Sequence, residues 1–203
     1  MTLPADLATT NLATTNDQSE ASGLLVVIVG PSGAGKDTLM DHARAAFASD
    51  ARFVFARRVI TRPAESGGED HLPATEEAFA RAAKAGDFAL SWSAHGLSYA
   101  IPAAVDADLA AGRIVLANLS RKVIAEAEVR FKHLAVIEIS APPAILARRL
   151  AARGRESEAD IAARLARDVP VEAARAPVHR LSNDRELASV VEEFLTLLRA
   201  LAR

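Results

Sequence analysis

A short run of the chain combines three glycines with a lysine and a carboxylate: Gly30-Pro31-Ser32-Gly33-Ala34-Gly35-Lys36-Asp37. It follows the apolar run 24–29 directly and precedes a helical pattern from Thr38 to Phe47. Glycines let successive backbone N–H groups turn toward an anion, and the following helix N-terminus adds partial positive charge. Lys36 is placed to reach the β- and γ-phosphates of a nucleotide. The context predicts a phosphate-binding loop; the alternative is a glycine-rich turn between core elements.

Asp37 stands where this motif usually carries Ser or Thr, and Thr38 follows it. A carboxylate beside a polyphosphate is repelled unless a cation lies between them. Because Mg²⁺ takes oxygen ligands and favours carboxylates, we expect Asp37 to be a direct or water-bridged Mg²⁺ ligand. The alternative is that Asp37 only caps the helix N-terminus, where Asp is also favoured.

The bulk properties exclude several classes of protein. A net charge of −2 rules out a generally basic nucleic-acid binder, and the lack of cysteine rules out disulfides and thiolate sites. No apolar run approaches the roughly 18 residues of a membrane span. We therefore expect a cytoplasmic protein that acts on small molecules and binds neither nucleic acid nor membrane. The oligomeric state stays open, with a homodimer as one option.

Strands alternate with helices along most of the chain. Residues 1–22 contain a short tandem duplication and no secretory pattern, so we expect a disordered tail before a single domain over 23–203. Alternating strands and helices predict an α/β fold whose parallel sheet is covered on both faces, with the ligand at the carboxyl ends of the strands. The expected strands are 24–29, 53–61, 113–118, 134–140 and 178–181.

Helices and one insertion complete the predicted organisation. Thr75 and Gly86 bracket one helix, Pro102 and Gly112 another, and Asn183 or Asp184 is expected to cap the last. Further helices are expected over 121–130, 142–153 and 160–167. Residues 88–101 alternate as two antiparallel strands around a turn near His95-Gly96. We expect this patch, within an insertion over about 57–101, to bind the acceptor, meaning the molecule that would receive a phosphoryl group from the nucleotide.

Arginine recurs between residues 141 and 167. Because a single phosphate-loop lysine cannot neutralise the charge on a transferring phosphoryl group, phosphotransferases add arginines from a mobile lid. We expect a mobile helical lid over about 148–167, with at least two of its arginines reaching the phosphates. A solvated pair of helices is the alternative. The arginines concerned are Arg148, Arg149, Arg153, Arg155, Arg164 and Arg167.

From Gly23 to its C-terminus the chain resembles the guanylate kinase fold in the order and spacing of its motifs. These are 30–37, Thr61-Arg62-Pro63, the run from Arg149 to Gly154, Arg164-Leu165 and Ser182-Asn183-Asp184. The resemblance implies a P-loop kinase of the nucleoside monophosphate kinase type that uses ATP. By that pattern Arg149, Arg153 and Arg164 clamp phosphates together with Lys36, Asn183 lies near the adenine, and Tyr99 touches the acceptor's phosphate.

The chain departs from guanylate kinases where those enzymes hold guanine with carboxylates. Ser91 precedes Trp92, and Asn118-Leu119-Ser120 ends a strand where an Asp-x-Asp run is usual. Losing charge-assisted hydrogen bonds of roughly 1.5–3 kcal/mol each should make guanine selectivity poor.

The replacements resemble a narrower family, the ribose 1,5-bisphosphate phosphokinases, which also carry Gly-Lys-Asp in the phosphate loop. The matching runs are 58–63, 67–71, 88–90, 94–97 and Asn118 with Ser120-Arg121. The resemblance implies transfer of the ATP γ-phosphoryl group to ribose 1,5-bisphosphate, which yields 5-phosphoribosyl 1-diphosphate during phosphonate breakdown.

Basic side chains in these runs are candidates for holding the acceptor's two phosphates, and surface ion pairs are the alternative role for each. Arg62, His95 and Arg121 are the favoured ones. The full set is Arg58, Arg62, His71, His95, Arg121 and Lys122. Two other functions stay open: a guanylate kinase or another small-metabolite kinase, and a non-catalytic binding module of the same fold.

Overall fold

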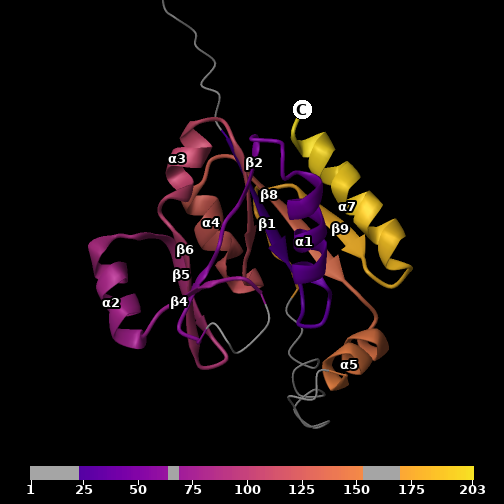
Figure 1. The fold of residues 1–203 in the computed structure, drawn as a ribbon, viewed down its shortest axis with the longest axis horizontal. Coiled ribbons are helices and arrows are strands. Elements are labelled where there is room, and N and C mark those ends of the chain that lie inside the picture. The colour runs from indigo at the N-terminus through magenta and orange to yellow at the C-terminus, as the bar shows by residue number, and fades with distance from the viewer. Residues whose placement is uncertain (1–22, 64–68, 153–169) are drawn as a thin grey trace, which may run out of the picture.

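The computed structural model describes residues 23–63, 69–152 and 170–203 (Figure 1). Within these residues, five parallel strands form one sheet in the order β2-β7-β1-β8-β9. The central strand is buried from Leu25 to Val29, as expected for a parallel sheet covered on both faces. The strands are β1 (Leu24–Val29), β2 (Phe53–Phe55), β7 (Ile114–Asn118), β8 (Leu134–Ser140) and β9 (Val178–Ser182).

Helices cover both faces of this sheet (Figure 1). On one face α1 (Lys36–Ala46) and α7 (Leu187–Leu201) bury Leu39 and Phe194 against alternate β1 residues such as Val26. On the other face α3 (Val105–Ala110) and α4 (Ile124–Arg130) pack over Val27 and its neighbours. Each fully buried aliphatic or aromatic side chain contributes about 1.5–3 kcal/mol to the stability of the fold. These two clusters therefore hold the main sheet, including the carboxyl ends of its strands, in place.

A second, smaller sheet with the order β4-β3-β6-β5 lies beside the first. Its strands are β3 (Val59–Ile60), β4 (Leu72–Pro73), β5 (Phe88–Ala94) and β6 (Leu97–Pro102). The β5–β6 and β3–β6 pairs are antiparallel, and β3 pairs with β4 in parallel. His95 and Gly96 form the tight turn of the predicted hairpin, with φ values of 53° and 73°. Two residues of positive φ are what a short right-twisted hairpin requires.

The helix of the insertion, α2 (Glu76–Ala85), has the boundaries that the sequence predicts. The Thr75 side chain accepts a 3.1 Å hydrogen bond from the Ala78 N–H, and Gly86 ends the helix with a φ of 80°. Phe79 packs its ring against Phe88 of β5, with 4.8 Å between the ring centroids. The helix is therefore attached to the hairpin rather than to the main sheet.

Three sequence expectations about local structure are wrong. The strand expected over 53–61 is two strands in different sheets, because the chain leaves β7 after Ala56 and Val59–Ile60 pairs with β6. Pro102 ends β6 instead of opening a helix, which begins at Val105. The last helix begins at Leu187, with Glu186 as its N-cap. The Asn183 side chain does not cap this helix but contacts the phosphate loop.

Several other expectations fall outside the described residues: the tail over 1–22, the helix over 160–167, and the roles of Arg153 and Arg164. The described part of the arginine-rich segment contains α5 (Pro143–Ala151), which follows Pro142. No helix in the described ranges is long and apolar enough to cross a membrane.

Candidate active site

The phosphate loop follows β1 directly and turns sharply at residues with positive φ. Gly30 has a φ of 142°, and a Cβ there would overlap the carbonyl oxygen of Ile139. Gly35, which precedes α1, has a φ of 91°, and a Cβ there would overlap the Asn183 amide nitrogen. Only glycine satisfies both requirements, since it tolerates positive φ and has no side chain. The loop shape therefore depends on these two residues.

Lys36 lies at the start of α1 and folds back over this loop. Its Nζ donates to the carbonyl oxygens of Gly30 and Pro31, at 2.8 and 3.0 Å. Burial lowers the pKa of Lys36 to about 8, and the charges of Arg58 and Arg121 act in the same direction, while Asp37 and Glu69 oppose it. These four charged groups therefore lie close enough to Lys36 to act on its ammonium.

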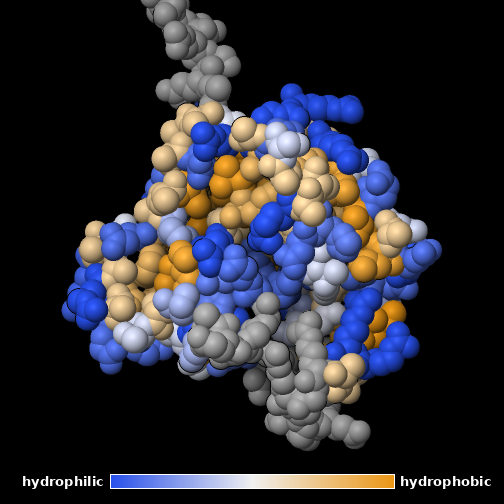
Figure 2. All heavy atoms as spheres, in the orientation of Figure 1, coloured by the Kyte–Doolittle hydropathy of each residue, from blue (hydrophilic) through white to orange (hydrophobic). Residues whose placement is uncertain are grey.

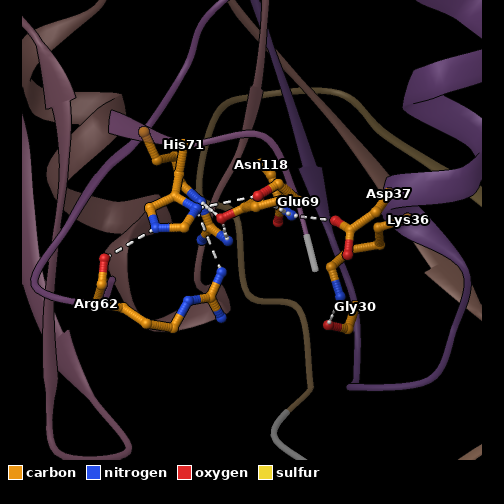
Figure 3. A network of polar contacts seen from close by, with 8 residues as sticks. Gly30, Lys36, Asp37, Arg62, Glu69, His71 and Asn118 are labelled. Carbon is orange, nitrogen blue, oxygen red and sulfur yellow. Dashed lines mark hydrogen bonds and ion pairs between the residues drawn. The ribbon is translucent and has the colours of Figure 1, made fainter. Parts of the chain in front are cut away.

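Asp37 and Glu69 are joined by one amide (Figure 3). Nδ2 of Asn118, the last residue of β7, donates to Asp37 Oδ1 at 3.0 Å and to Glu69 Oε2 at 3.3 Å. Figure 3 shows Glu69 and Asn118 between the loop residues on one side and Arg62 and His71 on the other. The carboxyl edge of the main sheet is thus connected directly to the insertion.

Arg58 pairs with Glu69 in the least exposed ion pair found in the described ranges. Its Nε donates to Glu69 Oε1 at 2.8 Å, its Nη2 contacts the same oxygen, and the two side chains are 14% and 15% exposed. The guanidinium also lies 5.1 Å from the Tyr99 ring centroid and 5.8 Å from that of Trp92. These two rings stack on each other across β5 and β6. Arg58 is therefore held in place from both sides.

His71 is buried and connects the two ends of the loop that precedes it. Its Nδ1 lies 3.0 Å from the Glu69 carbonyl oxygen and its Nε2 lies 3.1 Å from that of Arg62. The Arg62 guanidinium approaches Nδ1 at 3.4 Å, and the buried Arg62 Nε has no hydrogen-bond partner in the described part of the chain. The ring positions the backbone of both Arg62 and Glu69.

Arg149 and Asn183 hold the opposite side of the phosphate loop. Arg149 on α5 donates to the carbonyl oxygens of Asn183, at 3.0 Å, and Gly33, at 3.4 Å. The buried Asn183 amide donates to the Ala34 carbonyl at 2.7 Å. Asn183, which the family resemblance associates with the adenine, is here part of the wall of the loop.

Of the predicted residues, Asp37, Arg58 and Arg121 lie close enough to Lys36 to act on its charge. Asn118 contacts Asp37, and Arg149 contacts the phosphate loop at Gly33. Arg121 opens a short 3-10 helix (η2, Arg121–Val123) immediately after the β7 edge. His95 is exposed at the hairpin turn, and Ser91 is exposed on β5. Figure 2 shows hydrophilic residues gathered between the insertion and α1 on this face.

Sequence reasoning missed Glu69 as a site residue. The only available signal was a carboxylate in a run otherwise matched to a family pattern, and a lone acidic residue in a polar loop is commonplace. Its partners Arg58 and Asn118 lie 11 and 49 positions away. Pairing over such separations depends on how the two sheets pack together.

The donor set suits a magnesium ion that arrives with a nucleotide. The described residues contain no group of three or more His, Cys, Asp or Glu side chains arranged to hold a metal. Mg²⁺ commonly takes only one or two carboxylates and completes its shell with phosphates and water. Asp37 supplies such a carboxylate in the first turn of α1, so the site fits the ion.

A phosphate loop at the carboxyl edge of a parallel sheet, with a small sheet inserted beside it, defines a P-loop kinase of the guanylate kinase type. Solved structures share this fold. A guanylate kinase from Anaplasma phagocytophilum superposes with a TM-score of 0.62 at 18% identity, covering 89% of this chain and 87% of that one. A gluconokinase from Sinorhizobium meliloti 1021 gives 0.51 at 19% identity, covering 90% and 95%.

Sequence relatives identify the family within this class. A ribose 1,5-bisphosphate phosphokinase from Brucella melitensis is 47% identical over 89% of this chain and 94% of its own. Enzymes of the same name from Methylobacterium radiotolerans and Acidiphilium cryptum are each 56% identical, over 72% and 75% of this chain and 82% and 81% of theirs. The chain belongs to the ribose 1,5-bisphosphate phosphokinase family. It matches no family model, so its membership rests on these relatives.

Proposed function

We propose that this protein transfers the γ-phosphoryl group of ATP to the 1-phosphate of ribose 1,5-bisphosphate, forming 5-phospho-α-D-ribose 1-diphosphate and ADP. Besides family membership, one structural observation supports this proposal. Lys36 of the phosphate loop lies within the electrostatic influence of Arg58 from the insertion and Arg121 from the β7 edge. A donor phosphate and an acceptor phosphate are both served by this arrangement.

The reaction is a displacement at the γ-phosphorus. An oxygen of the acceptor's 1-phosphate donates an electron pair to the γ-phosphorus, and the bond to the β,γ-bridging oxygen breaks, leaving its pair on ADP. A phosphate monoester with a second pKa of about 6 is already mostly dianionic at neutral pH. No general base is needed, so the protein's task is to align two anions and offset their charge.

Lys36 and Arg149 are suited to the donor phosphates because, in the described ranges, their hydrogen bonds end on neutral carbonyl oxygens. Their charges are free to balance a polyphosphate while the loop 30–35 supplies backbone N–H groups. We assign the ATP site to residues 30–38 with Asn183 as its wall. Arg153 and Arg164 belong to the same proposal as lid residues.

The acceptor site is proposed to lie in the insertion over about 57–101, with Arg62, His95 and Arg121 as its phosphate contacts. Arg58 and Tyr99 form one wall of it, since the guanidinium lies over the Tyr99 ring. Asn118 connects this wall to Asp37. Asp37 would hold Mg²⁺, which when bound with ATP offsets negative charge on the phosphates.

The direct test is to incubate the purified protein with ATP, MgCl₂ and ribose 1,5-bisphosphate and to follow products by ³¹P NMR. We expect the diphosphate signals of 5-phosphoribosyl 1-diphosphate and of ADP to appear together. Lys36→Ala should retain the fold by thermal melt and lose at least about tenfold in kcat, or 1.4 kcal/mol of barrier.

GMP is the matched alternative acceptor. Because Ser91, Asn118 and Ser120 replace guanine-binding carboxylates, its kcat/KM should be far below that of ribose 1,5-bisphosphate. Comparable values for the two acceptors would favour a guanylate kinase. ATP binding without turnover of any acceptor would favour a binding module.

A further inference from the structure

We propose that Glu69 is a specificity-determining residue of the acceptor site, where its carboxylate accepts hydrogen bonds from the ribose hydroxyls. This inference rests on the proposed function, because it concerns how the same acceptor is recognised. Glu69 lies within the run 67–71 that matches the family, but that match assigns it no role. Its position is known only from the folded chain.

The charge of Glu69 is unusual for a site that receives a bisphosphate. Its side chain is 15% exposed and lies close enough to Lys36 to act on it. A carboxylate facing phosphate oxygens is repelled, so it is useful only where the ligand presents hydrogen-bond donors. The hydroxyl groups are the donors that a ribose bisphosphate offers once its phosphates are ionised.

The contacts of Glu69 leave room for such a donor. An ionised carboxylate has about four acceptor positions. Contacts within the described ranges use two of them on Oε1, both from Arg58, and one on Oε2, from Asn118 at 3.3 Å. The remaining position is on Oε2, the oxygen that faces the Asn118 amide.

The carboxylate is also held in a defined orientation before any ligand binds. Arg58 donates two hydrogen bonds to Glu69 Oε1 and is itself packed against the Tyr99 and Trp92 rings. His71 Nδ1 lies 3.0 Å from the Glu69 carbonyl, which fixes the backbone. A recognition group supported in this way discriminates well because little ordering remains to be done on binding.

Glu69 lies at the boundary between the two proposed sites. One amide, Asn118, connects it to Asp37 in the first turn of α1 (Figure 3). The phosphate that receives the γ-phosphoryl group is attached at C1 of the sugar, so the nearest hydroxyl is at C2. A carboxylate this close to the phosphate loop is best placed for the C2 hydroxyl, as acidic residues bind ribose hydroxyls in dinucleotide sites.

The experiment compares ribose 1,5-bisphosphate with 2-deoxyribose 1,5-bisphosphate, which has the same phosphates and lacks the C2 hydroxyl. Wild-type kcat/KM should favour the ribose compound by tenfold or more, since a site built around a hydroxyl rejects the analogue that lacks it. Glu69→Gln should reduce this preference to a few-fold, chiefly by lowering kcat/KM for the ribose compound. The KM for ATP should stay near the wild-type value.

The neighbouring Asp70 provides a matched control. Its carboxylate pairs with Arg57 at 2.7 Å, but both side chains are about half exposed, so Asp70→Asn should leave the preference unchanged. Equal losses with both sugars in Glu69→Gln would overturn the inference and assign Glu69 to supporting Arg58 only. If Glu69→Gln fails to fold, Glu69→Asp, which withdraws the carboxylate by one methylene, serves as the variant. Turnover of neither sugar by the wild type would instead overturn the proposed function, and this inference with it.

Discussion

The Asn118 side chain donates a 3.0 Å hydrogen bond to the carboxylate of Asp37, joining the end of β7 to the first turn of α1. The same nitrogen donates to Glu69 at 3.3 Å. An amide NH₂ has two hydrogens, so one residue can serve two carboxylates. An aspartate at this position could serve neither.

Asn118→Asp is therefore expected to destabilise the protein. The substitution removes two donated hydrogen bonds and places a third carboxylate beside two others, which should lower the free energy of unfolding by about 2 kcal/mol or more. Urea denaturation at pH 7 measures this, and Asn118→Ala, which removes the donors without adding charge, should lose less. Activity toward GMP should not appear, since Ser91 and Ser120 remain. A variant as stable as the wild type would contradict the bridging role.

Asp37 can be tested as a Mg²⁺ ligand. Gly35 precedes α1 and no side chain caps the helix, so Asp37 is not its N-cap. Asp37→Ser keeps a neutral oxygen and should retain activity with a higher Mg²⁺ requirement, whereas Asp37→Ala should lose more. Titrating activity against Mg²⁺, with thermal melts alongside, separates a metal role from a stabilising one. An unchanged Mg²⁺ dependence with only a lowered melting temperature would refute the metal role.

The lowered pKa of Lys36, about 8, predicts that ATP binding takes up a proton in alkaline solution. Well below pH 8 the ammonium is already mostly charged before ATP binds. Above pH 8 it is mostly neutral in the free protein, and the polyphosphate favours its charged form, so affinity should fall as pH rises. Calorimetry at pH 8.5 in buffers of different ionisation enthalpy measures the uptake. Lys36→Arg, whose guanidinium stays charged, should abolish it; equal uptake in that variant would assign the proton elsewhere.

Arg149 and Arg148 form a matched pair on α5. Arg149 contacts the phosphate loop and the Asn183 carbonyl, whereas Arg148 is exposed on the same helix. Arg149→Ala should lower kcat by about tenfold or more through lost charge stabilisation of the transferring group. Arg148→Ala should change kcat little. Steady-state kinetics with ATP and ribose 1,5-bisphosphate compares them, and similar losses in both would point to a general effect on the helix.

The contacts of Glu128 predict an acid-sensitive contribution to stability. This buried carboxylate on α4 accepts the backbone N–H groups of Ala176, Ala174 and Arg175, at 2.8, 3.0 and 2.7 Å, and these bonds lower its pKa below the usual 4.5. The unfolded chain binds the proton more readily, so the stabilisation is complete above pH 4.5 and is lost as pH falls through the lower folded value.

Glu128→Gln should accordingly lower the free energy of unfolding at pH 7 by about 2 kcal/mol, because charge-assisted hydrogen bonds are weakened. The gap between variant and wild type should narrow as the solution is acidified below pH 4.5. Chemical denaturation across pH 3 to 7 tests both statements. A gap that is constant with pH would mean that the carboxylate charge contributes nothing.

Local patterns predicted the elements that depend on neighbouring residues. The apolar strand 24–29, the glycine-rich loop after it and the Thr75 and Gly86 helix ends are where the sequence places them. The same holds for the hairpin turn at His95-Gly96. Prediction was wrong at the strand over 53–61, because its residues favour extended structure throughout and only pairing partners decide where one strand ends and the next begins.

The phosphate loop and the order of strands and helices of a P-loop kinase could be predicted from the residues alone, since glycine spacing and apolar runs are local properties. Which side chains meet around Lys36 depends on the tertiary packing. Arg58, Glu69 and Asn118 come from three separate segments, and packing of the insertion against the carboxyl edge of the sheet brings them within hydrogen-bond distance. A buried carboxylate acquires its partners from that packing, because each contact depends on distances that sequence separation does not encode.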